Sequence, residues 1–198
     1  MDTLKTKKYK YVQNMLSDDM LEFLSSFSVK KTVEGTNYFI DDFVEKSSSF
    51  HSKESEIYNH ILHFLLPVME KETNLKLKPI YSFNRIYLPG SKLKKHTDRE
   101  ACEISASVTL KYNYKDKDYK WPLCVGDTPI IIKSGDGVIY KGCEIEHWRP
   151  VFLQPDGCWH HQLFIHYVDK NGPYKNLMEE KTQKELDKNI NEGLGFKS

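Results

Sequence analysis

The feature that most constrains the fold is a series of short β-rich runs between residues 79 and 168. Branched and aromatic side chains dominate each run, and Gly, Pro or Asp residues separate one run from the next. The runs are Ile80–Tyr87, Ile104–Tyr112, Pro129–Ile132, Gly137–Tyr140, Ile145–Val151 and His161–Val168. Short strands at such spacing are typical of antiparallel β architectures. The sequence therefore predicts a mainly β fold, either an all-β barrel or a double-sheet jelly roll.

Helical patterns flank the β-rich part. Residues 11–27 are expected to form a helix with its N-cap near Ser17, since a hydroxyl there can accept from the first backbone N–H groups. Apolar residues at helical spacing predict a second helix over residues 54–73, which Pro67 can kink. The charged segment 176–191 also has a helical pattern. We therefore expect flanking helices packed on the outside of the β core.

The chain has 198 residues, which is enough for one domain with a substantial core. Its content of 39% apolar and 29% charged residues is ordinary for a globular protein. We predict a single domain over residues 1–198. Within it, residues 1–78 supply N-terminal helical support, residues 79–170 form the β core, and residues 171–198 form a C-terminal tail or helix.

Charge and cysteine usage restrict the partners. The formal net charge is +1, whereas a nucleic-acid binder more often has a clear basic excess. None of the four cysteines is spaced as C-x-x-C, so a zinc knuckle is not expected. The N-terminus does not read as a secretory signal, and the longest apolar run, residues 61–69, is too short to span a bilayer. We expect a cytoplasmic protein with free thiols and no nucleic-acid or membrane partner.

The strongest chemical signal is His96-Thr97-Asp98. Residues i and i+2 of a strand or its extended end project to the same face, so this histidine and this carboxylate can hold one metal ion. His147, 49 residues downstream, can complete a site of two histidines and one carboxylate. Such a site leaves coordination positions open, as non-haem Fe(II) oxygenases require. An H-x-D spacing alone is weak, and its value here comes from the flanking segments.

Three segments carry a resemblance to a known family. RIYLPGSKLKKHTD, SGDGVIYKGCEIEHWRPV and WHHQLFIHYVD follow one another in the chain. They resemble, in order, the stretches around the first histidine, the second histidine and the closing strand of prolyl 4-hydroxylase-like 2-oxoglutarate oxygenases. The resemblance covers about residues 79–170 and implies a double-stranded β-helix, a cupin-like jelly roll. It also implies that His96, Asp98 and His147 bind iron and that Tyr87 hydrogen-bonds the cosubstrate.

The sequence departs from this family in two places. The closing strand has His160 where the family usually has an Arg or Lys that binds the distal carboxylate of 2-oxoglutarate. Our first choice for the missing cation is Arg149, because strand alternation puts it on the side of His147. Lys111 is the second choice, and a protonated His160 can assist. Lys120-Trp121-Pro122-Leu123 replaces the family's Gly-Gly-x-Leu, so we do not place the chain among the collagen or oxygen-sensing prolyl hydroxylases.

Further residues are expected around the substrate. Arg85, Arg99 and Trp148 are assigned to the substrate pocket, although Arg99 can equally pair with a neighbouring glutamate and a tryptophan is more often a core residue. Alternation puts His160 and His166 on one face of the closing strand. We assign His166 to packing near the cavity floor and expect no second metal site.

The resemblance implies the chemistry. The cofactors are Fe(II), 2-oxoglutarate and O2, with ascorbate as a further candidate, and the products include succinate and CO2. The expected substrate is a C–H bond in a protein residue, proline-like, or in a small metabolite, and the oligomeric state is open. The alternative is a jelly-roll module that binds a metal or a small ligand without turnover. Consumption of 2-oxoglutarate with Fe(II) distinguishes the two.

Overall fold

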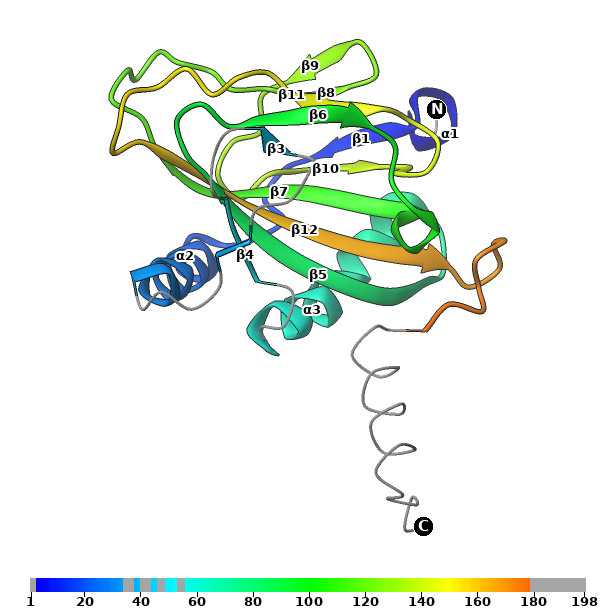
Figure 1. Cartoon of the computed structure of the whole chain (residues 1–198). Coiled ribbons are helices and arrows are strands. Elements are labelled where there is room, and N and C mark those ends of the chain that lie inside the picture. Colours follow the sequence, from blue (N-terminus) through cyan, green and yellow to red (C-terminus); the bar gives the residue numbers. More distant parts are fainter. Residues whose placement is uncertain (1–2, 34–37, 40–43, 46–48, 53–55, 179–198) are drawn as a thin grey trace.

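The computed structural model describes residues 3–33, 38–39, 44–45, 49–52 and 56–178 (Figure 1). Two sheets dominate it. The larger contains, in spatial order, β1 (Tyr9–Val12), β10 (Gly137–Tyr140), β7 (Ile104–Asn113), β12 (Trp159–Asp169), β5 (Leu77–Tyr87), β4 (Ser49–Ser52) and β2 (Tyr38–Phe39). The smaller contains β3 (Val44–Glu45), β6 (Lys92–His96), β11 (His147–Arg149), β8 (Leu123–Val125) and β9 (Thr128–Ile130). Among the described residues every strand pair is antiparallel.

Helices cover one face of the larger sheet. Figure 1 shows α2 (Asp18–Val33) and α3 (Glu56–Thr73) on the side of this sheet away from β6, β11 and β8. A short helix, α1 (Thr3–Lys7), precedes β1, and a 3-10 turn, η1 (Glu100–Cys102), precedes β7. The two facing sheets with helices on one outer face are a double-stranded β-helix, which confirms the predicted jelly-roll fold. Within the described part of the chain, no helix has the length and apolarity needed to cross a membrane.

Side-chain alternation on β12 separates two environments. Leu163, Ile165 and Tyr167 are fully buried and join the core beneath the helices. Burying a Leu or Ile side chain stabilises a fold by about 1.5–3 kcal/mol, so this face fixes the register of the strand. The residues between them point to the space between the two sheets. That inner face consists of His160, Gln162, Phe164 and His166.

The inner faces of β5 and β12 match residue by residue. The register pairs Tyr87 with His160, Phe83 with Phe164 and Tyr81 with His166. Aromatic and polar side chains from both strands therefore stack in layers inside the barrel. This interior is where the structure places most of the residues that the sequence singled out.

The N-terminal prediction is wrong for part of its range. Residues 9–12 form β1, which pairs with β10, and α2 begins only at Asp18. The Tyr11 hydroxyl donates to the Asp136 carboxylate at 2.5 Å, a tertiary contact that the local pattern does not reveal. Residues 1–78 thus add strands β1, β2, β3 and β4 to the two sheets as well as helical support. The Ser17 hydroxyl does accept from the backbone N–H of Met20, at 3.4 Å, as expected of an N-cap.

Other boundaries differ in detail. The helix predicted over residues 54–73 is α3, which the structure describes from Glu56 to Thr73 and which contains Pro67. Strands β6 and β8 were not predicted. The helix predicted over residues 176–191 falls outside the described residues from residue 179 onward, and residues 176–178 are not helical.

Candidate metal centre

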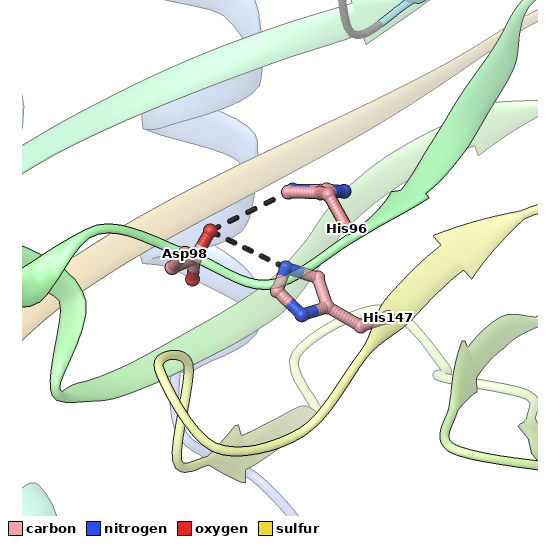
Figure 2. A group of neighbouring side chains, drawn as sticks. All are labelled: His96, Asp98 and His147. Carbon is pink, nitrogen blue, oxygen red and sulfur yellow. Dashed lines mark ion pairs between the residues drawn. The ribbon is translucent and has the colours of Figure 1, made fainter.

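The three residues of the predicted metal site lie together at one end of the barrel. His96 is the last residue of β6, Asp98 follows in the next turn, and His147 begins β11. His96 and His147 are direct partners in the pairing of these two strands. Figure 2 shows both imidazole rings directed at the Asp98 carboxylate. Asp98 Oδ1 lies 3.6 Å from His96 Nε2 and 3.5 Å from His147 Nε2.

Backbone contacts orient both rings. His96 Nδ1 lies 2.8 Å from the carbonyl oxygen of Lys94, and His147 Nδ1 lies 3.2 Å from that of Ile145. A carbonyl oxygen only accepts, so each Nδ1 is the protonated nitrogen and donates. In the neutral tautomer the lone pair is then on Nε2, the nitrogen that faces Asp98. Metal-binding histidines are commonly oriented by a partner on the other ring nitrogen in this way.

The electrostatics favour an ionised Asp98. Burial opposes the carboxylate, but the hydrogen bonds from His147 and His96 outweigh burial and hold the pKa of Asp98 well below its usual range. For His96, burial disfavours the charged form, yet its contacts with Asp98 and the Lys94 carbonyl raise its pKa above the ordinary value. In the absence of a cation, the site therefore favours a proton on the His96 imidazole. A divalent cation can replace those protons.

The donor atoms fit a bound metal. Ligands about 2.1 Å from a metal and at right angles to one another are separated by about 3 Å. The observed separations of 3.5 and 3.6 Å are slightly wider. Asp98 Oδ2 is buried and has no hydrogen-bond partner among the described residues. A set of two imidazoles and one carboxylate with open positions is the arrangement of non-haem Fe(II) sites.

A cavity of about 280 Å³ opens beside these residues. The triad lines it together with an aromatic wall from the inner faces of β5 and β12. In that wall the Tyr81 and His166 ring centroids are 4.4 Å apart, and those of Phe83 and Phe164 are 4.6 Å apart. The cavity is small enough to enclose a compact ligand next to a metal.

Of the three residues predicted to form the substrate pocket, two line the cavity and one does not. Arg85 and Arg99 both line the cavity. The Arg99 guanidinium carbon lies 4.8 Å from the centre of the Tyr81 ring, and that of Arg85 lies 5.7 Å from the centre of the Tyr87 ring. Trp148 is not part of the cavity lining, because it alternates with the two buried residues His147 and Arg149 on β11. Contact of either arginine with a substrate stays a prediction.

The residues predicted to bind the cosubstrate also differ in their position relative to the cavity. Tyr87 is fully buried and lines the cavity. Arg149 is buried and does not itself line the cavity, and its guanidinium carbon lies 5.9 Å from the centre of the Tyr87 ring and 4.6 Å from that of the Trp121 ring. Lys111 is remote from the cavity, because its ammonium pairs with Glu22 of α2 at 2.6 Å on the surface. This placement disagrees with its proposed role as second-choice cation.

His160 is not available as a cation. Burial, and then the positive charge of Arg149, push the pKa of His160 well below its ordinary value, so the ring is neutral. Its Nδ1 lies 2.6 Å from the Tyr114 hydroxyl and its Nε2 lies 2.8 Å from Gln162 Oε1. A neutral His160 argues against the assistance expected from a protonated ring, and a contact of His160 with the cosubstrate stays a prediction.

Arg149 is a buried cation held by neutral groups. It donates to the Trp121 carbonyl at 3.2 Å and to Gln162 Oε1 at 3.1 Å. Its Nε has no hydrogen-bond partner, and no carboxylate pairs with it within the described residues. Burial lowers the pKa of Arg149, yet a guanidinium stays charged at any working pH. A buried charge without a counterion is costly, so this position favours an anionic ligand.

Sequence reasoning missed several residues of this interior. Tyr81, Phe83 and Phe164 form the cavity wall, and Gln162 and Trp121 hold Arg149. Period-2 alternation counted outward from Tyr87 and His160 would have identified the first three and Gln162. Trp121 lies in a loop, where alternation gives no information.

Comparisons with known proteins give the fold a context. No protein-family model matches the sequence, and no curated protein matches it. Among solved structures, the chain is similar to a prolyl-4-hydroxylase from Pseudomonas putida, with 16% identity, a TM-score of 0.64 and coverage of 85% of this chain and 96% of that one. It is also similar to the viral collagen prolyl hydroxylase of Paramecium Bursaria Chlorella virus-1, with 15% identity, a TM-score of 0.60 and coverage of 82% and 97%.

A third similar structure contains ligands. HygX from Streptomyces hygroscopicus, solved with nickel and 2-oxoglutarate bound, has 12% identity to this chain, a TM-score of 0.58 and 85% coverage of each chain. These matches show that the chain has the double-stranded β-helix fold. The matched structures are prolyl hydroxylases and other 2-oxoglutarate-dependent Fe(II) oxygenases, the superfamily that the sequence motifs resemble.

Proposed function

We propose that this protein is an Fe(II)- and 2-oxoglutarate-dependent dioxygenase that hydroxylates a C–H bond of a protein residue or a small metabolite. The observation that carries the proposal is the convergence of His96, Asp98 and His147 on one point at the cavity. The ligand atoms of the three residues all lie within 4.8 Å of one another. They come from two paired strands and the turn that follows one of them, so the fold itself brings them together.

The chain's own residues have distinct roles in this proposal. His96, Asp98 and His147 hold the metal on one side and leave its cavity side open. The bound iron, with 2-oxoglutarate and O2, supplies the oxidising chemistry and releases succinate and CO2. The aromatic wall of the cavity excludes water from the reacting groups.

Arg149 is proposed to bind the distal carboxylate of 2-oxoglutarate. The ligand is a dianion, and Arg149 is the buried cation that the described residues leave without a carboxylate partner. Tyr87 lines the cavity, and its ring centre lies 5.9 Å from the Arg149 guanidinium carbon, which suits Tyr87 to contact the same ligand. Gln162 Oε1 accepts hydrogen bonds from Arg149, at 3.1 Å, and from Thr109, at 3.1 Å, and thereby positions the guanidinium.

The test is anaerobic addition of Fe(II) and 2-oxoglutarate to the full chain. Chelation of iron by a 2-oxo acid gives a weak visible metal-to-ligand charge-transfer band, and we expect this band in the wild-type protein. We expect none in His147→Ala. Lys111→Met, which removes a surface cation remote from the cavity, is the control and should retain the band.

Admission of O2 then separates an oxygenase from a binding module. An oxygenase converts 2-oxoglutarate to succinate even without its substrate, although slowly. A wild-type band followed by no succinate would contradict the enzyme proposal and favour a jelly-roll metal-binding module. Absence of the band in the wild type would contradict the site itself.

A further inference from the structure

We propose that Asp98, Cys102 and His166 form a second divalent-cation site that shares Asp98 with the iron site. The ligand atoms of these three residues all lie within 4.8 Å of one another. They come from the turn after β6, from η1 and from β12, which are distant in the sequence. From the sequence we expected no second metal site and assigned His166 to packing near the cavity floor, and its ring does stack on Tyr81.

The two carboxylate oxygens of Asp98 have different surroundings. Oδ1 faces His96 and His147, at 3.6 and 3.5 Å. Oδ2 is buried and has no hydrogen-bond partner among the described residues. A Cβ atom added to Gly142 would collide with both Asp98 Oδ2 and the backbone carbonyl oxygen of Cys102, so Oδ2 lies close to the Cys102 backbone. Asp98 can therefore bridge two cations with one oxygen each.

The other two ligands are already oriented. His166 Nδ1 lies 2.8 Å from the Ser105 hydroxyl, which leaves Nε2 as the ring nitrogen for a metal. Cys102 Sγ lies 3.1 Å from the Tyr81 hydroxyl, a donor that can stabilise a thiolate. Cys102 and His166 are exposed by only 2% and 3%. Ser105 and Tyr81 thus fix both side chains in place before any cation binds.

The ligand set selects the class of cation. Thiolate and imidazole ligands suit Zn²⁺, and three protein ligands leave a fourth tetrahedral position for water. Asp98, Cys102 and His166 all line the cavity, so that fourth position opens into it. The iron site, with two imidazoles and one carboxylate, contains no sulfur. The two sites therefore differ in softness and can be told apart by spectroscopy.

Sharing of Asp98 couples the two sites. A cation on Oδ2 draws electron density from the carboxylate and changes the affinity of the neighbouring site for Fe(II). Two-metal sites bridged by such groups have the metals about 3.5–4 Å apart. We infer that Zn²⁺ in the second site modulates iron binding in the first. This consequence rests on the proposed function, whereas the second site itself does not.

The probe is Co²⁺ added to the full chain without iron. Thiolate ligation of Co²⁺ gives an intense near-ultraviolet charge-transfer band that histidine and carboxylate ligands do not give. We expect this band in the wild type, its displacement by Zn²⁺, and its loss in Cys102→Ser. Cys143→Ser, which removes a neighbouring thiol outside the group, is the matched control and should keep the band.

His147→Ala separates the second site from the iron site. It breaks the triad and leaves Asp98, Cys102 and His166 intact, so the cobalt–thiolate band should persist while the 2-oxoglutarate–iron band is lost. His166→Phe keeps a ring in the aromatic wall and should weaken Co²⁺ binding at least tenfold. A wild type without the cobalt band overturns the proposal. So does a band that survives Cys102→Ser, or one that disappears in His147→Ala.

Discussion

Replacement of Arg149 by Met should have opposite consequences for the ligand-free protein and for its complex. In the ligand-free protein Arg149 is 1% exposed, and among the described residues it donates to two neutral acceptors while its Nε has no hydrogen-bond partner. Methionine is shorter than arginine, but it is unbranched, needs no counterion and packs well against aromatic rings. The lost hydrogen bonds to the guanidinium contribute about 1.5–3 kcal/mol each, and removal of a buried charge without a counterion, which costs several kcal/mol, offsets them. We expect the ligand-free Arg149→Met protein to be about as stable as the wild type.

The complex with 2-oxoglutarate should lose much of its stability. A hydrogen bond to a charged group contributes about 1.5–3 kcal/mol, so its loss makes the dissociation constant larger by about tenfold to hundredfold. If the wild type is saturated at 100 times its dissociation constant, the ligand stabilises it by about 2.7 kcal/mol. At the same concentration the variant would gain only about 0.4–1.4 kcal/mol.

Thermal unfolding without 2-oxoglutarate measures the stability of the ligand-free protein, and unfolding with 2-oxoglutarate measures the stabilisation that the ligand adds. The experiment uses Ni²⁺ in place of iron to prevent turnover, and Lys111→Met serves as the control for removal of a cation. Arg85→Met tests the other buried arginine, which lines the cavity directly. If Arg149→Met retained the full ligand-dependent stabilisation and Arg85→Met lost it, the assignment of Arg149 would be refuted while the oxygenase proposal survived. A ligand-free Arg149→Met that unfolds would also contradict the reasoning.

Three further outcomes are expected. Asp98→Ala and His147→Ala should each abolish the visible charge-transfer band of the complex with Fe(II) and 2-oxoglutarate, while circular dichroism remains that of the wild type. Gly142→Ala should weaken Fe(II) binding at least tenfold without altering a ligand, because the added Cβ would collide with Asp98 Oδ2. Fe(II) affinity should fall as the pH decreases, because protons compete for Nε2, and since contacts with Asp98 raise the pKa of His96, the fall should begin above the ordinary histidine pKa of about 6.5. If the measured Fe(II) affinity did not fall even at pH values well below about 6.5, competition between protons and the metal for Nε2 would be contradicted.

The β core was predictable because its pattern is local. Gly137–Tyr140 coincides with β10, and the inward direction of His160 and His166 on β12 follows from alternation. The metal triad was found because His96 and Asp98 lie within three residues, so that one strand end brings them together. His147 lies beside them because it begins β11, which pairs with β6.

Other features were not predictable because they depend on tertiary contacts. Residues 9–12 have a pattern compatible with a helix, yet pairing with β10 and the Tyr11–Asp136 hydrogen bond make them a strand. β6 contains Lys94 and Lys95, whose exposed side chains conceal the strand pattern. Lys111 was a candidate cation for the cosubstrate because its ion-pair partner could not be recognised from the sequence. That partner, Glu22, lies 89 residues away. A pattern cannot report which distant helix packs beside a strand.

The position of Arg149 explains how the barrel can function with a histidine on its closing strand. His160, Gln162 and Arg149 form one hydrogen-bonded group, in which Gln162 Oε1 accepts from both neighbours. His160 must be neutral here, because a second buried cation beside Arg149 would be repelled, and its lowered pKa agrees with this. Under the proposed function, the positive charge that would bind the distal carboxylate is supplied by Arg149 from β11, in the opposite sheet, and the closing strand would orient it through Gln162. Gln162 and Arg149 should therefore act as a unit, so Gln162→Leu should weaken 2-oxoglutarate binding in the wild type and have little effect in Arg149→Met. A double-mutant cycle on ligand affinity measures this coupling, and strictly additive effects would show that the guanidinium does not depend on Gln162.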